Sequence, residues 1–354
     1  MIIVGGGVEL FLPPPAYILG KTLVSQITFI SRKHDNLKGI EVLGMQEAMN
    51  VSGSSYEKSK KKQKWNVAFF KVLFLLPALL FLGIFMYYPI AETFHLSLMR
   101  TSGLGDSVFT GFDNYIRLFA NAEFQAGLIN VFAWAFWSVV IQIPLAFFIA
   151  FALSTYPNKI TSPLRAVYYM ASILPSAIVA MLGRFVFAPN FGIIASLSAK
   201  FHWDWLGRVD FLGNPQLAFW SLFTVATWAY SGFNIIYLMA NIEQIPKEIS
   251  EASQLDGANR GQYARYVVLP MVAYPLRICA ILCIVGSLKL FDLPYLLTKG
   301  GPGDATKTLG IILYQQGFVN WQYGKAAAVG VVIFLLSLIF TVAQFSWQRK
   351  EGDI

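Results

Sequence analysis

The residues whose types and spacing best suit a specific task lie in one polar segment, residues 242–265. Small and acidic side chains recur there at short intervals: Glu251, Ala252 and Ser253, then Asp256, Gly257 and Ala258. Small side chains let another protein surface approach closely, and the glycine permits a backbone conformation that lets one short helix turn into the next. Ser250 or a neighbour can cap the first helix, with Glu251 near its positive end, and Tyr263 offers an anchor back to the rest of the protein. The pattern predicts a docking contact.

The sequence has no arrangement of residues that is typical of catalysis or metal binding. It contains no phosphate-binding loop of the form GxxxxGK[ST], and the glycine-rich stretch at 300–307 lacks the GK[ST] ending. The three histidines, His34, His95 and His202, are scattered without the spacing of a metal site. The apolar segments carry no series of carboxylates or histidines that could relay protons. We therefore expect no catalytic residue, metal ion or cofactor in this chain.

The composition indicates an integral membrane protein. Of 354 residues, 56% are hydrophobic and only 13% are charged, and the mean hydropathy is +0.55. Soluble domains carry about 25% charged residues, so this chain cannot build an ordinary wet surface. The apolar runs are long and unbroken rather than alternating, which favours membrane-spanning helices over a barrel.

Six segments reach the length of about 20 apolar residues that a spanning helix needs. They are approximately 69–90, 128–153, 165–188, 217–241, 266–289 and 325–347. The two cysteines, Cys279 and Cys283, lie four residues apart on one predicted helix and are interpreted as small core residues.

Basic residues set the orientation of these spans. Lysines cluster at the entry to the first span, at positions 58, 60, 61, 62, 64 and 71. A nucleic-acid site is one interpretation of such a cluster, but its place beside a span favours the positive-inside rule, and no nucleic-acid partner is expected. The rule puts both termini and the connections 154–164 and 242–265 in the cytoplasm, and the loops 91–127, 189–216 and 290–324 outside.

The chain is expected to consist of an N-terminal tail, a membrane domain at 66–348 and a short C-terminal tail at 349–354. The tail, 1–65, begins with an apolar stretch that is broken by three glycines and three prolines and never reaches spanning length. It is interpreted as a disordered cytoplasmic segment, a segment lying on the membrane surface, or translation from a start codon placed too far upstream of Met45 or Met49.

The polar segment resembles the EAA loop of permease subunits of ABC importers. Ile245-Pro246 stands before it, the EAS and DGA triplets follow, and Leu269-Pro270 is expected to open the next span. Ser253 departs from the family's second alanine but is also small. The resemblance covers residues 66–347, including Pro89, the string GFDNYIRLF at 111–119, Asn130, Gly192, and Asn214-Pro215 leading to Trp228. The string FDLPYLLTKGGP at 291–302 is similar to the first permease of maltose-type carbohydrate importers.

The resemblance implies an all-α polytopic membrane protein with six transmembrane helices and the type I ABC importer permease fold. Its implied location is the cytoplasmic membrane of a bacterium or archaeon, where it lies in the lipid bilayer. It implies a second homologous permease, two nucleotide-binding ATPase subunits that hold ATP and Mg, and an extracytoplasmic sugar-binding protein. The ATPase would grip the loop at Glu251–Ala258, and a sugar would cross between the two permeases.

Sugars are bound by aromatic faces and by partners for their hydroxyl groups, so candidates for the substrate path are aromatic or neutral polar residues. On the predicted fourth helix they are Trp228, Tyr230, Phe233 and Asn234; near the outer end of the fifth they are Ser287, Leu290 and Phe291. Trp228 and Phe291 are equally interpretable as packing aromatics. A bare amide is costly in lipid, so Asn234 should face the protein interior. Lys289 and Asp292 are interpreted as a paired i,i+3 couple, or alternatively as a gate or sugar contact.

Three other functions fit the sequence less well than a sugar importer. A polyol or glycerol-phosphate importer subunit would have the same architecture, but a phosphate favours a cationic lining. A secondary transporter would need intramembrane ion sites at broken helices; Pro144, Pro175 and Pro275 interrupt predicted spans without such sites. A membrane-embedded enzyme would need clustered nucleophiles or ligands, which the sequence lacks.

Overall fold

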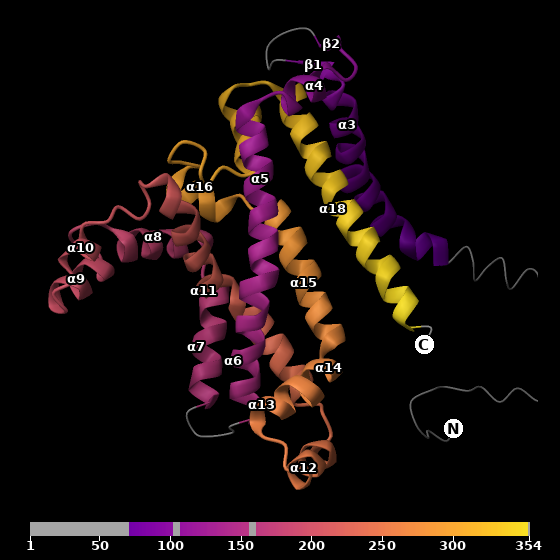
Figure 1. Cartoon of the computed structure of the whole chain (residues 1–354). Helices are drawn as coiled ribbons and strands as arrows, with labels where there is room; N and C mark the ends of the chain where they lie inside the picture. The colour runs from indigo at the N-terminus through magenta and orange to yellow at the C-terminus, as the bar shows by residue number, and fades with distance from the viewer. Residues whose placement is uncertain (1–70, 102–106, 156–160, 353–354) are drawn as a thin grey trace, which may run out of the picture. The chain divides into compact units, whose positions relative to one another are not determined.

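The computed structural model describes residues 71–101, 107–155 and 161–352, which are mostly helical (Figure 1). The chain divides into two units, Met1–Tyr88 and Pro89–Ile354. The expected N-terminal tail, 1–65, lies outside the described residues. In the first unit, residues 71–82 are helical and continue into a π-helical turn, η1 (Gly83–Tyr87). They belong to an apolar helical span, Lys71–Ser97, whose last part is α3 (Tyr88–Ser97), as predicted for 69–90.

Three further predicted spans are uninterrupted helices in the second unit. The segment Ala122–Thr155 matches the prediction for 128–153, and its π-helical turn ends two residues before Pro144, which has no N–H to donate. Asn121 and Asn214 start two of the spans by accepting a hydrogen bond from the backbone N–H two residues on. The elements are α5 (Ala122–Trp137), η2 (Ser138–Gln142), α6 (Ile143–Thr155), α11 (Pro215–Ile242) and α18 (Tyr323–Gly352). The predicted tail 349–354 therefore begins inside α18.

The predicted spans 165–188 and 266–289 are not single straight helices. The first is broken into α7 (Thr161–Ile173) and α8 (Ser176–Phe187), which meet at 105°. Pro175 explains this break, because proline donates no hydrogen bond and disfavours the helical conformation of the residue before it. Among the described residues, four helices are long and apolar enough to span a membrane, or six if each bent pair forms one span.

The second broken span bends by 73° between residues 260–271 and α15 (Ala273–Leu288). Leu269-Pro270 was predicted to open this span, but it lies at the end of the preceding short helix. Pro275 instead occupies the first turn of α15, where its missing N–H costs little. The elements before the bend are α13 (Arg260–Gln262), η3 (Tyr263–Val268) and α14 (Leu269–Met271).

The spans of the second unit pack through three apolar clusters. One joins α6 with α11 and α15, a second joins α8 with α11 and α16 (Asp292–Thr298), and a third joins α5 with α18 and α17 (Leu309–Tyr314). Gly232 lets α11 approach α7 closely, because a Cβ at this position would collide with the carbonyl oxygen of Tyr168. The first two clusters meet along α11, so this helix has buried side chains over most of its length.

Shorter elements cover the ends of this unit. A two-stranded antiparallel hairpin pairs β1 (Met99–Arg100) with β2 (Val108–Phe109), and α4 (Asp113–Phe119) follows it. The remaining elements are α9 (Ile193–Lys200), α10 (Asp204–Gly207), α12 (Lys247–Leu255) and η4 (Gln315–Val319). Figure 1 places the hairpin and α4 at one end of the second unit and α12 at the other.

Candidate functional site: an exposed loop and a cavity between helices

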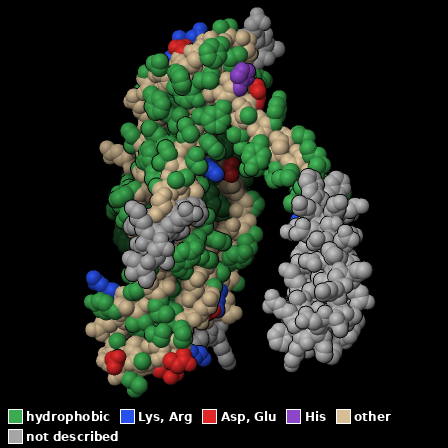
Figure 2. All heavy atoms as spheres, turned by 90° about the vertical axis from the view of Figure 1, so that its right-hand side faces the viewer, with side chains coloured by type: hydrophobic (Ala, Val, Ile, Leu, Met, Phe, Trp, Pro, Cys, Tyr) green, Lys and Arg blue, Asp and Glu red, His purple; other side chains and the backbone are tan. Residues whose placement is uncertain are grey.

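The helix α12, which carries Glu251, Ala252 and Ser253, is exposed along its length. None of its residues is buried, and Leu255 is 89% exposed. Figure 2 shows acidic side chains gathered at the end of the molecule where Figure 1 draws this helix. The predicted docking segment is thus accessible at the surface of this chain.

The chain reverses after α12 through a tight, fully hydrogen-bonded turn. Gly257 has φ +80°, as its predicted role requires, because side-chain-bearing residues rarely adopt this conformation. Its N–H donates to Gln254 O (3.1 Å), and the Ala258 N–H donates to Ser253 O (3.0 Å). These two bonds form the Schellman motif, in which a glycine closes a helix C-terminus. The positions of Asp256, Gly257 and Ala258 are thus fixed by the backbone.

The start of α12 differs from the prediction. The helix begins after Pro246, which provides no side-chain cap, so Ser250 lies within the helix and Glu251 lies at its middle rather than near the positive end. The capping instead occurs after the turn, where Asn259 and Gln262 each accept a hydrogen bond from the other's backbone N–H (2.9 and 2.8 Å). Capping holds the second short helix, α13, in place.

The segment is attached to the spans at both ends. The Tyr263 ring lies 6.2 Å from the Phe151 ring, and Tyr263 packs against the cluster of α6, α11 and α15, which confirms its predicted anchoring role. At the other end, Arg165 of α7 forms a 2.6 Å ion pair with Glu243, directly after α11. A force applied to α12 would therefore reach α6, α7 and α11 directly.

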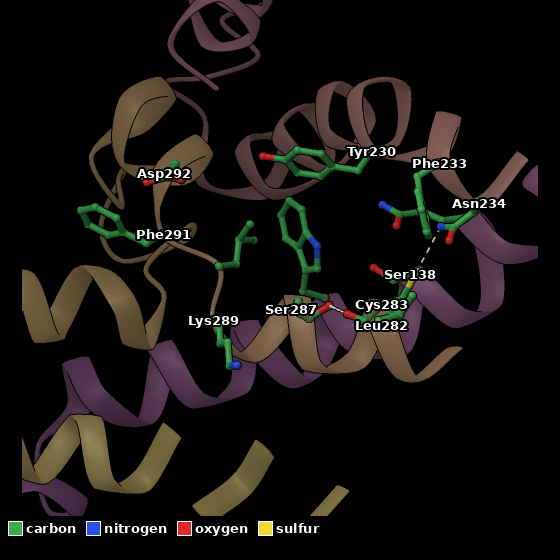
Figure 3. A pocket seen from close by; sticks show the side chains of 14 residues that line it. Ser138, Tyr230, Phe233, Asn234, Leu282, Cys283, Ser287, Lys289, Phe291 and Asp292 are labelled. Atoms are coloured by element: carbon green, nitrogen blue, oxygen red, sulfur yellow. Dashed lines mark hydrogen bonds between the residues drawn. The ribbon is translucent and has the colours of Figure 1, made fainter. Parts of the chain in front are cut away.

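A cavity of about 340 Å³ lies between α11, α15, the α5–η2 helix and the segment that joins α15 to α16 (Figure 3). Six of the seven residues predicted for the substrate path line it: Tyr230, Phe233, Asn234, Ser287, Leu290 and Phe291. The sequence thus located the two walls formed by α11 and by the end of α15.

Polar groups on these walls are held by their neighbours. Asn234 is only 6% exposed and faces the interior, as expected, where its Nδ2 lies 3.5 Å from Cys283 Sγ. The Ser287 hydroxyl donates to the Cys283 carbonyl (2.6 Å), which fixes this side chain against its own helix. The Asn234 carbonyl oxygen has no described partner and remains able to accept a hydrogen bond.

The aromatic wall is supported from behind by α17. Phe291 stacks on Tyr295 (5.2 Å between ring centroids) and lies 5.4 Å from Tyr314. Gly310 lets α17 contact this wall closely, since a Cβ there would lie 2.9 Å from Phe291 Cβ and 3.1 Å from Leu290 O. The position of α17 therefore determines the position of Phe291.

Trp228 stays a predicted substrate-path residue that this cavity does not test, whereas the predicted helical pairing of Lys289 with Asp292 is wrong. Trp228 is 47% exposed and does not line the cavity, because its direction from the α11 axis differs by more than 100° from those of Tyr230 and Asn234. Lys289 and Asp292 are not an i,i+3 helical pair, since α15 ends at Leu288 and α16 begins at Asp292. Both line the cavity, and Figure 3 shows the lysine extending away from the carboxylate.

The third wall, formed by Trp134, Ser138 and Gln142, was not predicted. Gln142 donates to the Thr227 hydroxyl (3.0 Å), and Trp134 packs edge-on against Phe223. The sequence does indicate this wall: Ser138 and Gln142 are four residues apart, so they share one face of the helix. Polar side chains are costly to expose to lipid, so this face should point into the protein.

Residues 142–350 match the family described as "Binding-protein-dependent transport system inner membrane component". This match covers more than half of the chain. The chain belongs to this family of inner membrane transport components. The permease is also 31% identical over 283 residues to a probable ABC transporter permease protein of Bacillus subtilis (strain 168), covering 79% of this chain and 96% of the relative.

Another relative supports the same assignment. The permease is 29% identical over 283 residues to a probable starch degradation products transport system permease protein of Thermoanaerobacterium thermosulfurigenes, covering 80% and 95% of the two chains. Its fold matches a crystal structure of a bacterial ABC transporter involved in the import of the acidic polysaccharide alginate, with a TM-score of 0.71 and 21% identity over 83% of this chain and 99% of that one. The predicted resemblance, fold class and membrane location of the permease are confirmed.

Proposed function

We propose that the permease forms one half of the translocation path of an ATP-driven importer for a sugar or oligosaccharide. A second homologous permease forms the other half, and an extracytoplasmic binding protein delivers the substrate. Two copies of an ATPase subunit hold ATP and Mg and contact α12 and the turn at Glu251–Ala258. Both chain termini lie in the cytoplasm with that turn.

The convergence of six predicted residues on one cavity is the observation that carries the substrate proposal. Its lining combines aromatic rings, from Tyr230, Phe233 and Phe291, with neutral hydrogen-bonding groups, from Asn234 and Ser138. Flat apolar faces beside a few fixed polar groups suit a sugar, whose rings have apolar faces and hydroxyl edges. The starch-product and alginate transporters that this chain resembles support the same substrate class.

The charges in the cavity argue against a dedicated phosphate substrate. Lys289 and Asp292 are the charged members of the described lining, and their charges cancel. Recognition of a phosphate ester favours a surplus of cationic donors. A glycerol-phosphate importer is therefore the weaker alternative, whereas a polyol shares the hydroxyl chemistry of a sugar.

Transport would follow from the coupling of α12 to the spans. When ATP binding draws the two ATPase subunits together, α12 moves with them and passes the displacement to α7 and α11 through the Arg165–Glu243 ion pair and to α6 through Tyr263. ATP binding can shift the equilibrium between the inward- and outward-facing states only if the ATPase contacts the two states of the permease with different affinity. This requires a stiff connection between α12 and the spans.

The substrate proposal is tested by uptake of labelled sugars, polyols and glycerol phosphate into cells that carry the complete transporter. We expect Asn234→Ala to lower the apparent affinity for a transported sugar by about three- to tenfold, the effect of one or two hydrogen bonds. Thr224→Ala is the matched control, because this exposed polar residue lies on the same helix but outside the cavity. Equal affinity in both variants would contradict the assignment of the cavity, and selective uptake of glycerol phosphate would favour the alternative.

A further inference from the structure

A second cavity, of about 380 Å³, lies at the end of the second unit opposite α12 and has no part in the proposed transport path. It is enclosed by the hairpin, α4 and the start of α18. Its described lining is Arg100, Thr101, Val108, Asp113, Asn114, Arg117, Gln322, Gly324 and Lys325. Three of these nine residues, Asp113, Asn114 and Arg117, belong to the string at 111–119, a motif for which the proposed transport mechanism gives no role.

The cavity is positively charged. Asp113 lies between two guanidinium groups, with Arg100 at 2.8 Å and Arg117 at 3.0 Å. The hydrogen bonds from Arg117 and Arg100 hold the pKa of Asp113 below its usual value, so the carboxylate remains charged. Lys325 adds a third cation, so the described lining carries three positive charges and one negative charge.

The wall formed by α18 contributes further positive potential. Gly324 and Lys325 lie in the first turn of this 30-residue helix, where the N–H groups have no partners within the helix. Gly324 brings the turn against β1, because a Cβ there would collide with the Met99 carbonyl oxygen. The partial charges at this helix end favour an anion.

The helix α4 presents an apolar face beside this cavity. Phe112, Ile116 and Phe119 are spaced four and three residues apart, which places them on one side of the helix, and they are 71%, 68% and 49% exposed. The opposite side is buried: the Asn114 amide donates to the carbonyls of Ser97 and Met99, both at 2.8 Å. The apolar face is thus held rigidly outward.

Aromatic side chains around the cavity place it at the level of the lipid headgroups. Phe109 of the hairpin is 68% exposed, and Trp321, just before α18, is 59% exposed. Exposed tryptophan and other aromatic rings at the ends of spanning helices are typical of the membrane–water interface. Figure 2 shows basic and acidic side chains together among hydrophobic ones at this end of the molecule.

We propose that this cavity binds the phosphate headgroup of an anionic phospholipid, while the exposed face of α4 lies against its glycerol and upper acyl chains. The cations and the helix start supply the charge that a phosphodiester needs. The apolar face of α4 favours a lipid over a soluble anion, because burying this face against acyl chains contributes to binding and a soluble anion has no hydrocarbon to cover it. Charge and apolar surface are adjacent, as they are in a phospholipid.

The proposal is tested by native mass spectrometry of the complete transporter, titrated with phosphatidylglycerol or with phosphatidylcholine of the same acyl chains. We expect the double variant Arg117→Gln, Lys325→Gln to reduce retention of phosphatidylglycerol roughly 25-fold, because each cation contributes about a fivefold attraction. Phosphatidylcholine retention should not change. Lys299→Gln is the control, because Lys299 is an exposed lysine of the same unit outside this cavity.

A second variant separates a lipid from a soluble anion. Ile116→Gln alters only the exposed face of α4, so it should weaken phosphatidylglycerol retention without changing the charge of the cavity. Soluble glycerol phosphate should fail to displace the lipid at equal concentration. Unchanged phosphatidylglycerol retention in the double variant, equal retention of both lipids by the wild type, or displacement by glycerol phosphate would each overturn the proposal. So would crosslinking that finds a protein subunit seated on Ile116.

Discussion

Replacing Lys307 with methionine should loosen the loop that holds the aromatic wall of the substrate cavity. The lysine Nζ lies 2.6 Å from Glu123 Oε1, 3.0 Å from Asp304 Oδ1 and 3.4 Å from Gln315 Oε1. Asn130 clamps the same loop, donating to the carbonyls of Asp304 (2.8 Å) and Lys307 (2.9 Å). The loop leads directly into α17, which contacts Phe291 through Gly310.

The structure gives the size of the expected effect. The Lys307 side chain is 11% exposed, whereas those of Glu123 and Asp304 are 30% and 41% exposed. Removing one member of a fully buried ion pair costs about 3–5 kcal/mol, and exposed pairs contribute about 0–1 kcal/mol. An intermediate loss of about 2 kcal/mol should lower the melting temperature by about 4–8 °C.

The assay combines thermal unfolding of the purified transporter with sugar uptake. The double variant Glu123→Gln, Lys307→Met should lose no more unfolding free energy than the two single variants lose together. Neither of the two charges that a single variant leaves unpaired is present in the double variant. Lys299→Met is the control on a neighbouring exposed lysine. A Lys307→Met protein that melts within 1 °C of the wild type and keeps its apparent affinity for sugar would refute this reasoning.

Three further perturbations have expected outcomes. Gly257→Val should strain the turn after α12 by about 1–3 kcal/mol, because the φ of this residue is +80°. It should abolish the stimulation of ATP hydrolysis by substrate while the permease remains folded in the membrane. Full stimulation would contradict the role of the turn. Gly310→Ala should push Phe291 into the cavity and raise the substrate concentration needed for half-maximal uptake, whereas unchanged uptake would show that α17 does not position the wall. Burial lowers the pKa of Lys307, but hydrogen bonds and charges from Glu123 and Asp304 raise it more, so the net pKa is above its usual value. The ion pairs of the charged lysine therefore stabilise the fold fully below about pH 10.4, and this stabilisation should be lost as the pH rises further. The corresponding decrease in melting temperature at high pH should be absent in Lys307→Met.

The parts of the fold that could be predicted from the sequence are those set by local chemistry. The turn at Gly257 followed from one glycine after a short polar helix, and the positions of the spans followed from apolar length. Asn234 was placed inward because an unpaired amide in lipid is costly, and it is buried. Each of these features depends on residues within one or two helical turns.

The features that were missed depend on how distant segments pack. Pro175 was recognised as an interruption, but the 105° bend that follows depends on contacts between α8, α11 and α16. Trp228 was chosen by its distance along the chain, which does not give its direction from the helix axis, and it lies outside the cavity. The ion pair between Glu123 and Lys307 joins residues 184 positions apart, and no pattern in a single sequence indicates such a pair.

The central claim is that α12 is the surface through which a separate ATPase drives this permease. A photocrosslinking residue at position 255 tests it most directly, because Leu255 is 89% exposed and its replacement disturbs no packing. In intact cells that carry the complete transporter, irradiation should join the permease to a nucleotide-hydrolysing subunit, and a probe at Lys299 should not. A crosslink from position 255 to an extracytoplasmic protein, or none to any nucleotide-hydrolysing subunit, would contradict the account.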